Sequence, residues 1–295
     1  MADYVLSCCS TVDLSLERLA QLDIQWIPFH YELDGVEHLD DLGQTMPAEK
    51  FYAAMSAGAD TKTSQVNVHE FKEHFGRIVS QGKDVLHLTL SSGISGVIQS
   101  AEIAANEIMA ENPGSHVYVV DSLGASAGYG LIMDKLAELR DEGMGLEELR
   151  DWAIDNRLKL HHWFYSTDLK FYVKGGRVSK AAGFFGTALR ICPLLNVDNV
   201  GKLIPREKIR TKKRAAAAAL GKMEEHAEGG LAYDGKVFIS HSMMHNEVKE
   251  LAAAIEQKFP NLAEPVQIFN IGTTIGSHTG PGTVALFFWG DERVD

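Results

Sequence analysis

The first half of the chain alternates between short apolar runs and longer segments with helical periodicity. Residues 4–7, 24–29, 85–90 and 117–120 are runs of strand length, and apolar side chains recur at helical spacing over residues 94–108. Strands that alternate with helices usually pair in parallel, and helices then cover both faces of the sheet. The sequence therefore predicts an α/β fold with a parallel sheet and flanking helices.

The second half has a different rhythm, in which short strand-like runs dominate. Residues 191–197 and 202–204 flank Asp198-Asn199-Val200-Gly201, a hairpin signal, and helices are expected over 211–227 and 244–255. This pattern predicts a second layer of the α+β class.

We therefore expect two domains, an N-terminal α/β domain over residues 1–160 and a C-terminal α+β domain over residues 161–295. Inside the first domain, Asp34-Gly35 is a strong two-residue turn signal. It predicts a hairpin insertion near residues 24–45, at an edge of the parallel sheet.

Composition excludes several classes of protein. Hydrophobic residues make up 45% of the 295 residues, and the net charge of −12 gives no general reason to bind nucleic acid or an anionic membrane. The chain shows neither a secretory leader nor a run of apolar residues long enough for a membrane helix. Cys8, Cys9 and Cys192 show no metal-binding or disulfide spacing. We expect a cytoplasmic protein without metal or cofactor.

Small hydroxyl-rich segments follow three of the predicted strands, at residues 7–11, 91–96 and 121–126, and residues 61–65 form a loop of the same character. Ligands of parallel sheets bind beyond the carboxyl ends of the strands. The 91–96 segment also leads directly into a helix, whose first N–H groups attract anions. Taken singly, each serine is better explained as a cap or turn residue, but together they favour a site for one carboxylate.

A second glycine-rich segment, residues 272–282, contains His278 and leads into the aromatic strand Phe287-Phe288-Trp289. Its glycines predict a loop with tight turns. A histidine in such a loop favours a role at the ligand over a role in the core.

Five motifs occur in an order that spans nearly the whole chain. They are Lys62-Thr63-Ser64-Gln65, Ser91-Ser92-Gly93-Ile94-Ser95-Gly96 with Gln99-Ser100-Ala101, Val119-Val120-Asp121-Ser122, Lys174-Gly175-Gly176-Arg177-Val178-Ser179, and Ile275-Gly276-Ser277-His278-Thr279-Gly280-Pro281-Gly282. Together they resemble the motifs of the DegV family.

This resemblance implies a fatty-acid carrier, not itself an enzyme, that buries a long acyl chain in a tunnel between two domains. In members that act with a fatty acid kinase, the carboxylate is presented to a separate kinase subunit and becomes an acyl phosphate. The family pattern assigns the carboxylate contacts to Thr63, Ser95 and His278, and leaves the role of Arg177 more open. The other expected ligand-binding residues lie in the same motifs: Ser64, Ser92, Gly96 and Gly276.

Neutral donors suit this task, because hydroxyls and an imidazole hold a carboxylate without burying a fixed positive charge. Two positions depart from the family pattern. Cys9 replaces the first acid of the usual Asp-Ser-Thr-x-Asp, and Val97 stands where threonine is common. The first change puts the polar network under the first loop in doubt.

A serine hydrolase is the alternative from another class. Gly124-Ala125-Ser126-Ala127-Gly128 matches the G-x-S-x-G elbow, with Asp168 and His278 following in hydrolase order. A pattern of glycine and serine also matches by chance, and Ser126 is expected inside the next helix. His241 and His245 lie four apart and are interpreted as a strand-to-helix turn.

The run from Arg206 to Arg214 holds six basic residues in nine. Such a run is usually a solvated face. In a chain of net negative charge, it is also a candidate docking patch for an acidic partner, and no nucleotide-binding loop is present that would let the chain phosphorylate a ligand itself.

Overall fold

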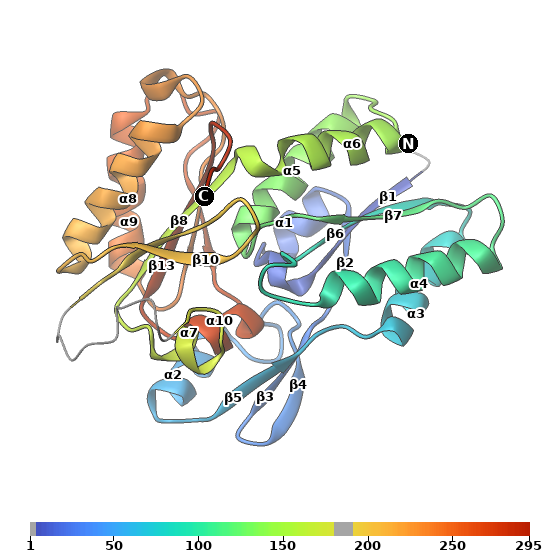
Figure 1. The fold of residues 1–295 in the computed structure, drawn as a ribbon, viewed down its shortest axis with the longest axis horizontal. Coiled ribbons are helices and arrows are strands. Elements are labelled where there is room, and N and C mark those ends of the chain that lie inside the picture. Colours follow the sequence, from blue (N-terminus) through green and yellow to red (C-terminus); the bar gives the residue numbers. More distant parts are fainter. Residues whose placement is uncertain (1–3, 180–190) are drawn as a thin grey trace.

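The computed structural model describes residues 4–179 and 191–295. Residues 1–3, where the sequence predicts no secretory leader, lie outside this part. The described residues form a four-stranded, a six-stranded and a three-stranded sheet, and Figure 1 shows the two larger sheets on either side of a central helix. No helix in these two ranges is long and apolar enough to cross a membrane.

The four-stranded sheet is parallel throughout, as predicted. Its order is β2 (Ile24–Ile27), β1 (Tyr4–Cys9), β6 (Asp84–Thr89) and β7 (Val117–Asp121). Helices cover both of its faces, with α3 (Val68–Val79) and α4 (Val97–Glu111) on one, and α5 (Ala127–Asp141) and α6 (Leu146–Asn156) on the other (Figure 1). The short helix α1 (Leu16–Gln21) packs beside β2.

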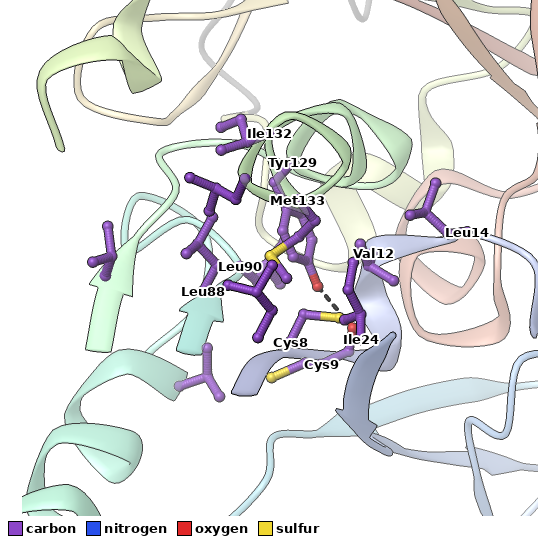
Figure 2. Close-up of a cluster of buried hydrophobic side chains, with 14 of the residues drawn as sticks. Cys8, Cys9, Val12, Leu14, Ile24, Leu88, Leu90, Tyr129, Ile132 and Met133 are labelled. Atoms are coloured by element: carbon purple, nitrogen blue, oxygen red, sulfur yellow. Dashed lines mark hydrogen bonds between the residues drawn. The ribbon is translucent and has the colours of Figure 1, made fainter. Parts of the chain in front are cut away.

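Because both faces of this sheet are buried, its strands appear in the sequence as continuous apolar runs. Every residue of β1 is buried, and Cys8 and Cys9 point to opposite sides of the strand (Figure 2). On one side, Tyr129 and Met133 of α5 lie over Cys8 and Leu88, and the Tyr129 hydroxyl donates to the Cys9 carbonyl at 2.9 Å. This packing fixes α5 against the parallel sheet.

The six-stranded sheet is mixed, which confirms the predicted α+β layer. Its order is β10 (Leu203–Glu207), β9 (Leu194–Val197), β8 (Leu160–Ser166), β13 (Thr283–Trp289), β11 (Phe238–His241) and β12 (Gln267–Asn270), and only the last pair is parallel. Helices α8 (Lys212–His226) and α9 (His245–Lys258) cover its outer face, and α5 packs on its inner face. The predicted domain boundary falls where β8 begins, although the division into two domains stays a prediction.

The predicted hairpin exists, but its place in the fold was predicted wrongly. Strands β3 (His30–Leu33) and β4 (Val36–Leu39) turn at Asp34-Gly35, which both have positive φ, and they form a separate antiparallel sheet with β5 (Thr61–Ser64). The strand before them, β2, belongs to the parallel sheet. Helices α2 (Ala48–Ser56) and α10 (Thr273–Thr279) pack against this small sheet and each other, and α7 (Lys170–Lys174) contacts α10.

Among the polar contacts between the N-terminal and C-terminal halves, those of Asp134 and Tyr52 position the helices around the cavity. The buried carboxylate of Asp134 on α5 pairs with Arg18 and with Lys236, which lies just before β11. The Tyr52 hydroxyl of α2 donates to the Ile271 carbonyl at 2.9 Å. These contacts hold α5, α2 and the start of α10 in a fixed relation, and the candidate site lies among them.

Candidate ligand-binding site

A cavity is lined by residues from the six-stranded and three-stranded sheets, from loops that follow strands of the parallel sheet, and from α7 and α10. The space between its lining residues is about 730 Å³, part of which is open to solvent. About half of the lining side chains are apolar, among them Phe29, Leu90, Phe164, Ile275 and Phe287, and none carries a carboxylate.

One wall of the cavity is the paired strands β8 and β13. Side chains alternate between the two faces of a strand, so every second residue reaches the same side. His162 and Phe164 from β8 line the cavity, as do Thr283, Ala285 and Phe287 from β13. The residues between them face α8 and α9 in a separate apolar cluster. The pairing of these two strands therefore separates the ligand wall from an outer core.

At one place on the cavity wall, three predicted site residues meet. The Thr63 hydroxyl of β5 lies 2.7 Å from Nε2 of His278 on α10, and Arg177 Nη1 lies 3.4 Å from Nδ1 of the same ring. Burial, helped by the Arg177 charge, lowers the pKa of His278 from 6.5 to about 4. The imidazole is therefore neutral at pH 7.

The proton on this imidazole can be assigned from its neighbours. Arginine only donates, so Nδ1 of His278 must accept, and a neutral ring then carries its proton on Nε2. That N–H donates to Thr63 Oγ1 and leaves the hydroxyl hydrogen of Thr63 free. The cluster can thus donate to a ligand oxygen.

Arg177, whose role the sequence left open, adds a fixed positive charge to the neutral donors at the cavity. Its guanidinium donates to the carbonyls of Gly175 at 2.6 Å and Ile94 at 3.3 Å, and burial lowers its pKa from the ordinary value. Because arginine stays protonated in proteins, a positive charge lines the cavity directly behind His278.

Ser95 lines the same cavity from the loop after β6. Its Oγ accepts from the backbone N–H of Val97 at 3.3 Å, so its hydroxyl hydrogen is available to a ligand. Thr63, Ser95, Arg177 and His278 are therefore brought to one cavity from four separate segments. That they hold a carboxylate stays a prediction.

The other four predicted residues do not line the cavity. Ser64 follows Thr63 on β5 and is exposed, as strand alternation requires, and Ser92 and Gly96 are exposed as well. Gly276 is buried, but a Cβ there would lie 2.4 Å from the Tyr52 hydroxyl. That glycine lets α10 approach α2 and so places His278 indirectly.

Two of the predicted loops are regular elements. Residues 61–64 form strand β5, and Thr273–Thr279 form helix α10, so Thr63 lies on a strand and His278 on a helix. Both segments are short and rich in glycine, threonine and serine, which are poor formers of either element in isolation. Packing against β3 and α2 decides their conformation.

This helix explains residues that the sequence analysis missed. Thr274, Ile275, His278 and Thr279 all line the cavity, because positions four apart share a helix face. The buried Thr279 hydroxyl has no hydrogen-bond partner among the described residues. A helical interpretation of residues 273–279 would have identified Thr279 as a second potential donor.

Ser126 was predicted inside a helix, and this is wrong. It precedes α5, has a φ of 55°, and lines the cavity. Its hydroxyl contacts the buried carboxyl of Asp13 and the Ser240 hydroxyl. Within the described ranges no histidine is hydrogen-bonded to Ser126, and His278 pairs with Thr63 instead. The contacts of Ser126 therefore give the serine hydrolase alternative no support.

The Cys9 substitution leaves an uncharged network under the first loop. Cys9 Sγ lies 3.6 Å from Nε2 of His87, whose Nδ1 is 2.9 Å from Ser7 Oγ, and that hydroxyl is 2.7 Å from Nε2 of His74. Burial raises the pKa of Cys9 and lowers the pKa values of both histidines. The network persists without the acid.

The interpretation of His241 and His245 is confirmed. Strand β11 ends at His241 and α9 begins at His245, and Nδ1 of His241 accepts from the backbone N–H of Met244 at 3.2 Å. The first histidine therefore caps the turn.

Comparison with known proteins agrees with this geometry. The family model described as "Uncharacterised protein, DegV family COG1307" matches residues 9–291. A DegV domain-containing protein of Clostridium perfringens is 32% identical over 99% of both chains, and a fatty acid-binding protein of Thermotoga maritima is 33% identical over 94% of both. The structure of a fatty-acid-binding DegV family protein from Thermus thermophilus superimposes with a TM-score of 0.86 at 26% identity, over 98% of this chain and 99% of that one.

Fold and cavity together define a class of α/β proteins with a cavity between two sheets. Within that class, the chain belongs to the DegV family.

We expect His278 to make stability depend on pH. Its pKa is about 4 in the folded protein and 6.5 ordinarily, so between these values only the unfolded chain takes up the proton. The contribution is complete above pH 6.5 and is lost as the pH falls toward 4. His278→Gln should make the free energy of unfolding fall less steeply, by up to about 1.4 kcal/mol per pH unit, as measured by urea denaturation from pH 7 to 4.5.

The matched control is His69→Gln, because the His69 side chain is 82% exposed. Its curve should follow the wild type. Parallel curves for His278→Gln and wild type would contradict the prediction.

Proposed function

We propose that the protein binds a long-chain fatty acid in this cavity, with the carboxylate at Thr63, Ser95, Arg177 and His278. On this proposal the chain is a lipid carrier and not itself an enzyme. The acyl chain would lie against the apolar lining, and each buried methylene would contribute roughly 0.8 kcal/mol. A cytoplasmic location stays a prediction.

One observation carries the proposal. Arg177 is half-buried at the cavity wall, and among the described residues no carboxylate pairs with its guanidinium. Residues 180–190 contain neither Asp nor Glu. A desolvated charge is costly without a counter-charge, so an anionic ligand head group is the natural partner.

Two further points support this choice of ligand. The cluster offers hydroxyl hydrogens from Thr63 and Ser95 next to one cation, which suits one carboxylate better than a polyphosphate with several charges. The names of the relatives described above include fatty-acid-binding proteins. A carboxylate with a long apolar tail is the chemistry common to these observations.

We also propose that the carboxylate is presented to a partner kinase, which forms the acyl phosphate. Arg177, Ile94 and Leu203 line the cavity and also a surface groove that includes Gly93, Gly175, Gly176 and Lys202. Glycines without side chains leave the backbone accessible there, so a ligand oxygen near Arg177 would be within reach of a second protein. The groove is also lined by Ile204 and Pro205 of β10, the strand that leads into the exposed basic residues.

The central test is direct. Protein purified under native conditions should release a long-chain fatty acid on solvent extraction, detected by mass spectrometry. Delipidated protein should then bind palmitate or oleate, measured by calorimetry. Repeated absence of an acyl chain together with no binding by delipidated protein would reject the carrier function.

Thr63→Val should weaken palmitate binding by about 10-fold or more. Valine keeps the shape of threonine and removes the hydroxyl hydrogen that the site offers to a charged oxygen, a bond worth about 1.5–3 kcal/mol. Calorimetry on delipidated protein measures the change.

The matched control is Ser64→Ala, one residue along β5, where the side chain is exposed and outside the cavity. It should bind palmitate like the wild type. Equal affinities for the Thr63 and Ser64 variants would remove Thr63 from the site while leaving the cavity as the binding place.

For the kinase step we expect Lys208→Glu combined with Arg210→Glu to slow acyl phosphate formation at low salt, with fatty-acid binding unchanged. Both residues are exposed after β10 and can steer an acidic surface. The assay uses limiting carrier, the kinase and ATP, and raised salt should shrink the difference because salt screens such steering.

The control carries the same charge reversal outside this run, at Lys50 on α2 and Arg150 on α6. It should sustain the wild-type rate. If the double variant also sustains that rate at low salt, the basic run is not the docking surface.

A further inference from the structure

The outer face of the β8–β13 pair carries a cluster that the lipid site does not use. His161 from β8, His226 at the end of α8 and Asp291 just after β13 meet there. Asp291 Oδ1 lies 3.0 Å from His161 Nε2 and 3.2 Å from His226 Nδ1. The three potential ligand atoms all lie within 4.8 Å of one another.

Backbone bonds fix this spacing. The Asp291 N–H donates to the His226 carbonyl at 3.1 Å, and the Gly290 N–H donates to the Lys159 carbonyl at 2.8 Å. A Cβ at position 290 would lie 2.1 Å from the His226 carbonyl oxygen, so the close approach of the two segments requires glycine. The three side chains therefore start from rigid positions.

The two imidazoles are held in place by stacking. The His161 ring stacks on His226 at 4.8 Å between centroids and on Phe288 at 5.2 Å, and its side chain is buried. Asp291, in contrast, is exposed, so an ion can reach the cluster from solvent. Glu225 Oε2 lies 3.8 Å from the far nitrogen of His226, beyond hydrogen-bond distance, and pairs with Lys222 at 2.8 Å.

We propose that His161 Nε2, His226 Nδ1 and an oxygen of Asp291 bind one divalent first-row transition metal ion, with Zn²⁺ the best fit. Ligands about 2.1 Å from a tetrahedral Zn²⁺ ion lie roughly 3.4 Å apart, close to the two histidine–carboxylate separations of 3.0 and 3.2 Å. Water from the open side completes the coordination. The proposed fatty-acid binding does not depend on this ion. The ion would join β8, α8 and the segment after β13.

The ligand set decides the class of metal. Ca²⁺ and Mg²⁺ take oxygen ligands, and this cluster offers one carboxylate only. Two imidazoles with a carboxylate suit Zn²⁺, Cu²⁺, Ni²⁺ or Co²⁺. His161 Nε2 also lies 2.9 Å from the Asp291 backbone carbonyl, so metal binding requires the ring to give up that contact and carry its proton on Nδ1.

The test uses the untagged full chain, treated with chelator, dialysed and titrated with ZnCl₂ by calorimetry. We expect one equivalent to bind and the thermal unfolding midpoint to rise, since an ion that binds the folded state stabilises it. Co²⁺ in place of Zn²⁺ should give visible absorption of a low-symmetry site. His226→Ala should lower Zn²⁺ affinity by at least about 100-fold, because even partners beyond the ligands contribute 10- to 100-fold.

Asp291→Ala is the second variant, because its exposed side chain can be removed without loss of folding. His69→Ala is the matched control. His69 lies 3.4 Å from Glu73 on an exposed helix face but has no second histidine, so its loss should leave Zn²⁺ binding intact. Zn²⁺ affinity unchanged in Asp291→Ala, or lowered equally in His69→Ala, would overturn the proposal.

Discussion

The antiparallel pairing of β8 with β13 is the constraint on which the rest of the molecule depends. The register holds along both strands, from Thr283 opposite Ser166 to Trp289 opposite Leu160. With this register fixed, alternate side chains build two different environments, the cavity wall on one face and the packing surface for α8 and α9 on the other. A shift of one residue would exchange His162 with His161 and so remove both the cavity wall and the outer histidine cluster.

A second constraint is charge. The interior holds several titratable groups, and burial favours the uncharged form of each: it raises the pKa values of Asp13 and Cys9 and lowers those of His87 and His162. Arginine cannot follow this rule, because it does not lose its proton. Arg177 is therefore the side chain at the cavity whose charge burial does not remove, and this asymmetry is why we propose an anionic ligand.

Periodicity predicted the parallel sheet and most helices because those segments bury a continuous or regularly spaced apolar surface. It failed for β5 and α10, whose sequences are short and small and take their form from tertiary contacts. The motifs still identified Thr63, Ser95, Arg177 and His278, since motif position survives an error in local structure. The same motif also named Ser64, which does not line the cavity, because a motif does not say which of two neighbours faces inward.

The contact between α10 and Tyr52 explains why no single segment of the sequence identifies the site. Because Gly276 has no side chain, the Tyr52 hydroxyl can lie close to α10. This hydroxyl donates a hydrogen bond to the Ile271 carbonyl just before that helix. That contact fixes the position of α10 relative to the three-stranded sheet, and with it the distance between His278 and Thr63. Gly276, which does not line the cavity, thus positions two residues that do.

The separate contact between Ser126 and Asp13 works in the same way. Asp13 also accepts from the Gly272 N–H at 3.0 Å and so links the start of α5 to the start of α10. The geometry of the cavity is therefore a property of how α2, α5 and α10 pack together, and the motif residues acquire their roles only within it.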